Sequence, residues 1–165
     1  MKNKDGVWID NMEETINKLI KINKTISVME SCTGGNISNS ITNIPGASNI
    51  FSFGAVTYSN DYKIKLGVNK ELIDKYTVYS MEVSRDMARA ITEYTNSSYG
   101  IGVTGKMYKP DPKNPYGEDN IVYVSICDKD NNKYYSKKIE LIHDNRIDNK
   151  NQVLEELILL LKENI

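Results

Sequence analysis

The chain has 165 residues, enough for a substantial core, and we expect a single domain spanning residues 1–165. Its 21 basic and 22 acidic side chains nearly balance, which argues against nucleic acid or an anionic membrane as partner and favours a small molecule. No apolar leader follows Met1–Asp5 and no apolar run approaches the length of a membrane span, so we expect a cytoplasmic protein.

Hydrophobic spacing predicts helices alternating with strands. The expected elements of the first half are an amphipathic helix at Trp8–Ile22 that buries Trp8, Ile9, Met12, Ile16, Leu19 and Ile20, a strand at Thr25–Met29, a helix from about Thr33 to Asn43, and a strand at Phe51–Tyr58. Next come one or two helical turns at Asn60–Lys65, a short helix at Lys70–Tyr76, and a longer helix after Ser80.

The second half predicts a strand at Tyr99–Thr104, a hairpin of Ile121–Cys127 and Lys133–Ile139, and an amphipathic helix at Ile147–Lys162. Strands interleaved with helices indicate an α/β fold, a three-layer sandwich with a central sheet flanked by helices. The closing hairpin should make this sheet mixed rather than all parallel.

Ser31 lies where the first strand should end and a helix should begin, within Glu30-Ser31-Cys32-Thr33-Gly34-Gly35. The first turn of a helix has unpaired N–H groups and the positive end of the macrodipole, so it can stabilise an oxyanion or a phosphate. Gly34 and Gly35 would let a ligand approach the backbone closely. An ordinary helix cap explains the same residues equally well, and these residues alone leave both interpretations open.

Metal and histidine chemistry have little support in this sequence. The two cysteines, Cys32 and Cys127, fit neither a disulfide scaffold nor a zinc site, and we expect neither a metal nor a cofactor. The only histidine, His143, lies in a polar stretch and is expected to be structural or exposed. A nucleophilic Ser31 would therefore need a base other than histidine.

Four segments together resemble the C-terminal domain of the CinA family, the nicotinamide-nucleotide amidohydrolases, over nearly the whole chain. They are Glu30–Gly35, Pro45-Gly46-Ala47-Ser48, Val56-Thr57-Tyr58-Ser59-Asn60-Asp61-Tyr62-Lys63 and Val103-Thr104-Gly105, with Asp144-Asn145-Arg146 similar to the family's basic element before the last helix. The resemblance implies a metal-free hydrolase that converts nicotinamide mononucleotide to the acid and ammonia, in NAD salvage, as a homodimer.

Carried over by residue, the resemblance implies that Ser31 is the nucleophile, Lys63 the base and Tyr58 a positioning or relaying hydroxyl. It also implies that Thr33, Gly34, Gly35, Thr104, Gly105 and Arg146 bind the substrate. A partly buried lysine can act as a base because desolvation lowers its pKa. Without the resemblance, Tyr58 would be interpreted as a core aromatic and Lys63 as a solvated helix residue. Cys32 is a competing nucleophile, although we expect a buried packing residue.

The chain departs from the family after Thr104-Gly105. The family continues with a glycine-rich loop, whereas residues 106–120 contain three prolines and Lys106, Lys109 and Lys113. These lysines could replace backbone contacts to a phosphate, or they could form a solvated basic loop. Two alternatives to the nicotinamide nucleotide therefore stay open: a nucleotide-binding protein without catalysis, and a hydrolase of the same mechanism acting on another amide.

Overall fold

The computed structural model describes residues 7–110 and 112–165, with the backbone alone for residues 7–11. The segment Met1–Asp5 and the side chains of Trp8 and Ile9, for which the sequence made predictions, therefore lie outside the described residues. No helix of the described chain is long and apolar enough to cross a membrane.

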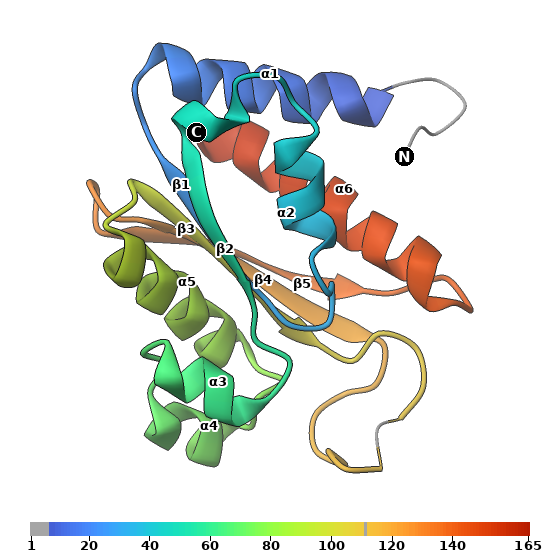
Figure 1. Cartoon of the computed structure of the whole chain (residues 1–165). Helices are drawn as coiled ribbons and strands as arrows, with labels where there is room; N and C mark the ends of the chain where they lie inside the picture. Colours follow the sequence, from blue (N-terminus) through green and yellow to red (C-terminus); the bar gives the residue numbers. More distant parts are fainter. Residues whose placement is uncertain (1–6, 111) are drawn as a thin grey trace.

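The elements follow one another as the hydrophobic pattern predicts (Figure 1). The helices are α1 (Val7–Lys21), α2 (Asn36–Thr42), α3 (Asn60–Lys65), α4 (Lys70–Tyr76), α5 (Met81–Thr95) and α6 (Arg146–Asn164), with a 3-10 turn at Ala47–Asn49. The strands are β1 (Ile26–Glu30), β2 (Phe51–Val56), β3 (Tyr99–Gly105), β4 (Ile121–Asp128) and β5 (Lys133–Glu140).

The strands form one sheet in the order β2-β1-β3-β4-β5. β1 pairs in parallel with β2 and β3, while β3–β4 and β4–β5 are antiparallel, so the predicted mixed sheet is confirmed. β1, β3 and most of β4 are buried on both faces, which explains their nearly continuous apolar sequences. β2 and β5 form the two edges of the sheet.

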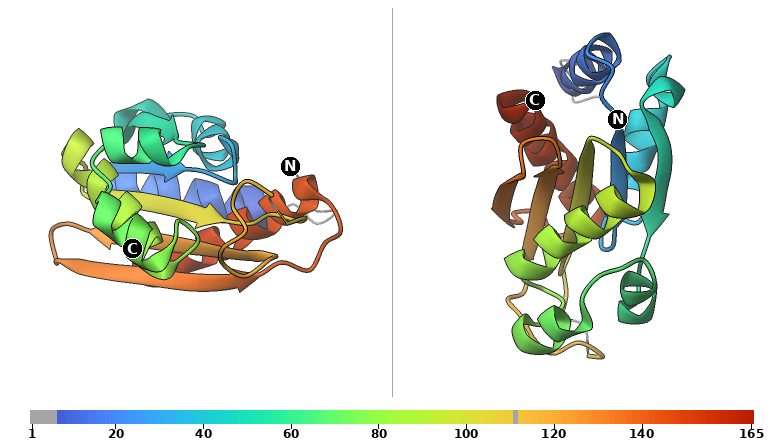
Figure 2. Two further views of the ribbon diagram at one scale, coloured as in Figure 1. Left: turned by 90° about the horizontal axis from the view of Figure 1, so that it is seen from below. Right: turned by 90° about the vertical axis from the view of Figure 1, so that its left-hand side faces the viewer.

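Helices cover both faces of the sheet, giving the predicted three layers (Figures 1 and 2). On one face α1, α2 and α6 enclose a core that includes Ile16, Leu19, Ile37, Leu157 and Leu161. On the other face α4 and α5 pack Ile73, Val83, Met87 and Ile91 against the sheet around Met29. Packing on both faces therefore fixes the positions of the strand ends in the sheet.

Three predicted boundaries differ from the structure at places that matter for the site. The second strand ends at Val56 rather than Tyr58, because residues 57–59 leave the sheet before Ser59 caps α3 through its hydroxyl. The helix expected from Thr33 begins at Asn36, after a turn in which Gly34 and Gly35 adopt left-handed φ angles of 61° and 97°. The last helix begins one residue early, at Arg146.

Candidate functional site

The carboxyl ends of β1 and β2 bring Ser31 and Thr57 to the same end of the sheet. The two strands are parallel neighbours, and the Thr57 N–H donates to the Glu30 carbonyl over 2.8 Å. The connection after β1 runs through α2 on one face, whereas the connection after β2 runs through α5 on the other face. Ligands of open α/β sheets bind at such a point, where successive connections leave in opposite directions.

Lys63 reaches Ser31 from α3. Its Nζ donates to the Ser31 Oγ over 3.1 Å and to the Thr57 carbonyl over 2.7 Å. Lys63 is only 1% exposed and Ser31 only 8%, so the contact is shielded from bulk water. Lys63 is therefore not the solvated helix residue that the sequence alone would suggest.

Burial lowers the pKa of Lys63 to about 8, because the apolar surroundings penalise its charged form. Among the described residues, the ammonium donates to the Ser31 hydroxyl and the Thr57 carbonyl but forms no ion pair with a carboxylate. With this pKa roughly a tenth of Lys63 is neutral at pH 7, and the lone pair of that form can accept the Ser31 proton. A serine hydroxyl beside such an amine is an activated nucleophile.

Tyr58 occupies a different position from the core location that its sequence context suggests. Its side chain is 66% exposed, and it lines a cavity of about 340 Å³ together with Ser31 and Lys63. Among the described residues its hydroxyl makes no hydrogen bond to either of them. The structure thus brings Ser31 and Lys63 into contact and leaves Tyr58 on the open side of the same cavity.

Cys32 is a packing residue in this geometry. It is 7% exposed and belongs to the core between the sheet and α2. Burial raises the pKa of its thiol to about 12, so it stays protonated and a poor nucleophile at neutral pH. Ser31, not Cys32, has the adjacent base.

The turn after Ser31 already uses several of its own N–H groups. The Gly34 N–H donates to the Ser31 carbonyl over 3.1 Å, and the Gly35 N–H donates to Glu30 Oε2 over 3.1 Å. The Thr33 N–H donates to neither the Ser31 carbonyl nor Glu30 Oε2. The fully buried Thr33 hydroxyl has no hydrogen-bond partner among the described residues. The two glycines expected to bind the substrate thus serve first to shape the turn.

Beside Ser31 lies a larger cavity of about 480 Å³. Gly105, the start of the 106–120 loop and Arg146 line it, along with Ser31, Cys32 and Tyr58. Its described lining includes Lys106, Lys109, Lys113 and Arg146 but no acidic side chain. Thr104 is buried behind it, and its hydroxyl donates to the Val78 carbonyl over 2.8 Å rather than facing the cavity.

Arg146 is held at the cavity by the start of α6. Asn145 caps this helix by accepting the Asp148 N–H over 2.9 Å. The fully buried Asn149 donates to the Met107 and His143 carbonyls over 2.6 and 3.1 Å, tying α6 to the 106–120 loop. His143 itself is exposed, as expected.

The 106–120 loop is anchored by Lys106, which the sequence suggested either as a contact to a phosphate or as part of a solvated basic loop. Lys106 is 5% exposed, and its Nζ contacts Asp119 Oδ1 over 3.2 Å and the Gly117 carbonyl over 3.4 Å. The same ammonium lies 5.3 Å from the centre of the Tyr79 ring. Lys106 therefore stabilises the loop, while Lys109 and Lys113 also line the cavity.

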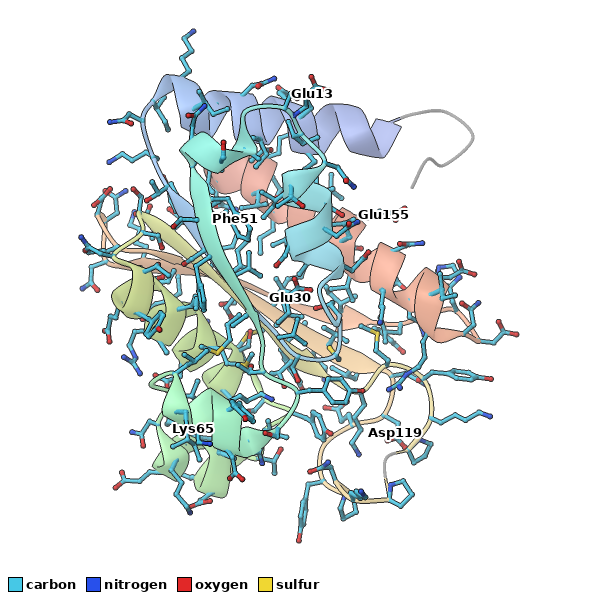
Figure 3. All side chains as sticks on the ribbon, in the orientation of Figure 1. Glu13, Glu30, Phe51, Lys65, Asp119 and Glu155 are labelled. Carbon is cyan, nitrogen blue, oxygen red and sulfur yellow. The ribbon has the colours of Figure 1, made fainter. Side chains whose placement is uncertain are left out.

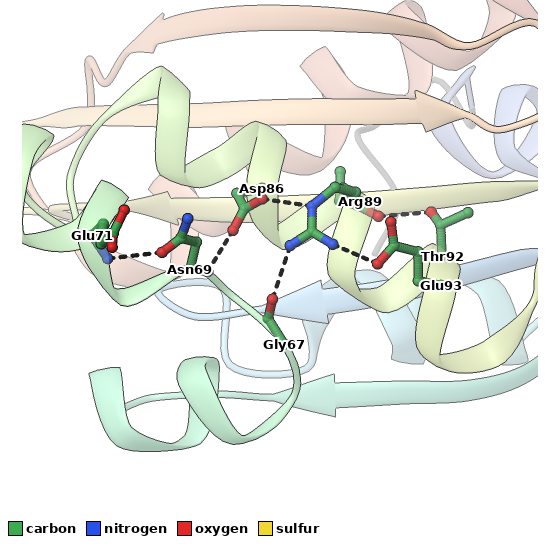
Figure 4. Close-up of polar contacts among 8 residues, drawn as sticks. Gly67, Asn69, Glu71, Asp86, Arg89, Thr92 and Glu93 are labelled. Carbon is green, nitrogen blue, oxygen red and sulfur yellow. Dashed lines mark hydrogen bonds and ion pairs between the residues drawn. The ribbon is translucent and has the colours of Figure 1, made fainter.

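The segment after Lys63 is fixed by a polar network on α5 (Figure 4). Buried Asp86 accepts the Asn69 N–H over 2.6 Å and Arg89 Nε over 2.7 Å. Arg89 also donates to the Gly67 carbonyl over 2.9 Å. The network holds the link between α3 and α4 against α5, and so restrains the helix that carries Lys63.

Sequence reasoning missed Glu30, Lys106 and Asn149 as structural members of this site. A signal existed for Glu30, because a charged residue ends a strand that is otherwise suited to burial on both faces. Lys106 and Asn149 gave no comparable signal, since their partners lie 13 and 42 residues away in the chain.

Comparisons with known proteins agree with this architecture. A family profile described as the CinA C-terminal domain matches residues 9–165. A competence-damage inducible protein of Alkaliphilus oremlandii is 44% identical over 118 residues, which cover 70% of this chain and 28% of that protein. One from Thermoanaerobacter pseudethanolicus is 39% identical over 137 residues, covering 82% and 32% respectively. The chain thus spans about a third of the length of these relatives.

Solved structures share the fold at low sequence identity. A CinA superfamily protein from Klebsiella pneumoniae has a TM-score of 0.85 at 18% identity, covering 94% of this chain and 95% of that one. A CinA superfamily protein from Escherichia coli has a TM-score of 0.80 at 20% identity, covering 99% and 91% respectively.

Proposed function

The chain belongs to the CinA C-terminal domain family, and from this membership and its site we propose that it is a metal-free serine amidohydrolase acting on the carboxamide of nicotinamide mononucleotide. The observation that carries the proposal is the buried Lys63 Nζ, 3.1 Å from the Ser31 Oγ and with a lowered pKa. A buried lysine with no carboxylate partner among the described residues is unfavourable for stability, and its position beside a serine supports a role in chemistry.

In the proposed reaction the Ser31 Oγ attacks the carboxamide carbon while neutral Lys63 takes the hydroxyl proton. The carbon–nitrogen bond then breaks, and Lys63 passes the proton to the leaving nitrogen, which departs as ammonia. Water, deprotonated by the same lysine, then attacks the acyl carbon. The bond to the Ser31 Oγ breaks, Lys63 returns the proton to that oxygen, and the carboxylic acid is released. We place the developing oxyanion at the turn after Ser31, near the Thr33 N–H.

Recognition of the nucleotide is assigned to the larger cavity. Arg146 and the loop residues Lys109 and Lys113 supply positive charge there, and a guanidinium suits the paired oxygens of a phosphate. Tyr58 is placed beside the substrate on the open side of the cavity. A role in NAD salvage in the cytoplasm, as a homodimer, is part of the same proposal and rests on the family resemblance.

Ammonia release from nicotinamide mononucleotide, nicotinamide and simple aliphatic amides tests the proposal. We expect turnover of the nucleotide, its loss in Ser31→Ala, and wild-type turnover in Ser40→Ala. Ser40 is a suitable control because it lies on the next helix with its hydroxyl bonded to the Asn36 carbonyl. Full activity of Ser31→Ala would reject the serine mechanism, and turnover of the simple amides alone would reject the nucleotide.

A second candidate is a protein that binds the nucleotide without hydrolysing it. The observation in its favour is the 106–120 loop, where prolines stand at positions at which N–H groups could wrap a phosphate and where Lys106 is committed to Asp119. Saturable binding of nicotinamide mononucleotide by calorimetry, without ammonia release from any amide, would select this candidate.

A further inference from the structure

Glu30 is a fully buried carboxylate that the proposed reaction does not use. Figure 3 labels it at the lower end of α2, where β1 passes into the turn that carries Ser31. A buried carboxylate is stable only when its oxygens are satisfied by donors. The donors that hydrogen-bond to Glu30 therefore indicate its role.

The four hydrogen bonds that the described residues donate to the carboxylate come from the turn and the first residues of α2. Oε2 accepts the Gly35 and Ile37 N–H groups over 3.1 and 3.2 Å, and Oε1 accepts the Ser38 N–H and hydroxyl, both over 2.8 Å. Glu30 therefore satisfies the unpaired donors and the positive end of α2 from inside the chain. The N–H groups of Gly35, Ile37 and Ser38 are consequently closed to a substrate anion.

The backbone of Glu30 is connected to the base. Its carbonyl accepts the Thr57 N–H over 2.8 Å and the Thr57 hydroxyl over 3.3 Å. The Thr57 carbonyl in turn accepts the Lys63 Nζ over 2.7 Å. One residue thus fixes the turn that bears Ser31 through its side chain and the carbonyl that orients Lys63 through its main chain.

We propose that Glu30 is the positioning residue of the site, holding the Ser31 Oγ where it meets the Lys63 Nζ. The inference rests on the proposed function only in taking Ser31 as a nucleophile, and requires no particular substrate. Because the carboxylate acts by geometry, its loss should slow the reaction of Ser31 without changing the pH at which Lys63 titrates. A displacement of about 1 Å between reacting groups is sufficient for a roughly 10²-fold loss.

A fluorophosphonate probe tests this without an amide substrate, with labelling of Ser31 followed by mass spectrometry against pH. In that reaction the Ser31 oxygen bonds to phosphorus, fluoride leaves, and Lys63 takes the proton. Glu30→Gln preserves volume but turns an NH₂ group toward two N–H or O–H donors. We expect labelling of this variant to be roughly 10²-fold slower at its plateau, with the midpoint of the pH profile unchanged.

Thr95→Ala is the matched control, because it removes hydrogen bonds at the end of α5, from the Thr95 hydroxyl to the Ile91 carbonyl over 2.8 Å and from the Ser97 N–H to that hydroxyl over 3.3 Å. It should lose thermal stability and label at the wild-type rate. The proposal is overturned if Glu30→Gln reaches the wild-type labelling rate at its plateau, whether or not the midpoint of its pH profile shifts. Glu30 would then act only as a helix cap or through its charge.

Two further outcomes are decisive. If Glu30→Gln does not fold, Ser38→Ala replaces it, and we expect labelling to slow by about threefold to tenfold; an unchanged rate overturns the proposal. Absence of labelling in the native protein also overturns it, since there is then no nucleophile to position. Native labelling at Ser31 without hydrolysis of any amide would reject the proposed function while the positioning role is still decided by the variants.

Discussion

Replacing Lys63 by methionine should change how stability depends on pH. The pKa of Lys63 falls from 10.5 in the free side chain to about 8 in the folded protein. The unfolded chain therefore binds more protons than the native chain between these values, and native stability rises with pH across that window. Below pH 8 the full penalty for burying the charge is present.

The magnitude follows from the shift. At pH 7 the buried charge destabilises the fold by about 3 kcal/mol relative to an uncharged side chain, and at pH 9.5 by about 1 kcal/mol. Methionine also leaves the Thr57 carbonyl and the Ser31 hydroxyl without the lysine donor, which costs about 1 kcal/mol each at either pH. The net change at one pH is therefore small, whereas its difference between the two pH values should be about 2 kcal/mol.

Urea unfolding followed by far-ultraviolet circular dichroism at pH 7 and 9.5 measures this difference. Lys65→Met is the control, because Lys65 is exposed on the same helix and its removal should give a difference between the two pH values near zero. An equal free-energy change for Lys63→Met at both pH values would show that Lys63 titrates normally. The assignment of Lys63 as a base poised near neutral pH would then be refuted.

Three further changes test other parts of the site. Arg146→Ala should weaken binding of nicotinamide mononucleotide in calorimetry by about tenfold with an unchanged melting temperature, because Arg146 is exposed at the cavity; unchanged affinity would place the phosphate elsewhere. Tyr58→Phe should lower kcat by less than about tenfold, since the hydroxyl bonds neither Ser31 nor Lys63, and a loss of 10² or more would assign it a proton-transfer role. Asp86→Ala should lower the free energy of unfolding in urea by about 2 kcal/mol, because the Asn69 N–H and Arg89 lose their acceptor; a stability equal to wild type would show that this network does not hold α3 in place.

The fold was predictable because its signals are local. Val28 and Ile101 lie in short segments that contain β-branched residues, and the apolar spacing of Val83, Met87 and Ile91 marks one face of α5. Each element can therefore be predicted from its own segment of sequence. The ends of elements were less predictable. The start of α2 depends on Glu30 accepting N–H groups five to eight residues ahead, which no spacing rule reveals.

The site was predictable in part, and only because of the family resemblance. Sequence context alone would have placed Lys63 in solvent and Tyr58 in the core, and the structure shows the opposite burial for both. The reason is that the chain leaves the sheet at Thr57 and turns into α3, which directs Lys63 inward toward Ser31. Burial of this kind is set by the path of the backbone rather than by residue type.

The 106–120 loop has a consequence for how this protein could acquire new specificity. Its two ends meet where β3 pairs with β4, with Gly105 opposite Val122 and the Lys106 N–H donating to the Ile121 carbonyl over 3.0 Å. A segment closed at its base can change length or sequence without altering the sheet, and doubling such a loop adds only about 0.6 kcal/mol of closure entropy. Ser31 and Lys63 lie on other elements. In the function proposed above, the nucleophile and its base are thus encoded apart from this loop, and a variant loop grafted between Gly105 and Ile121 would present new groups to an unchanged Ser31.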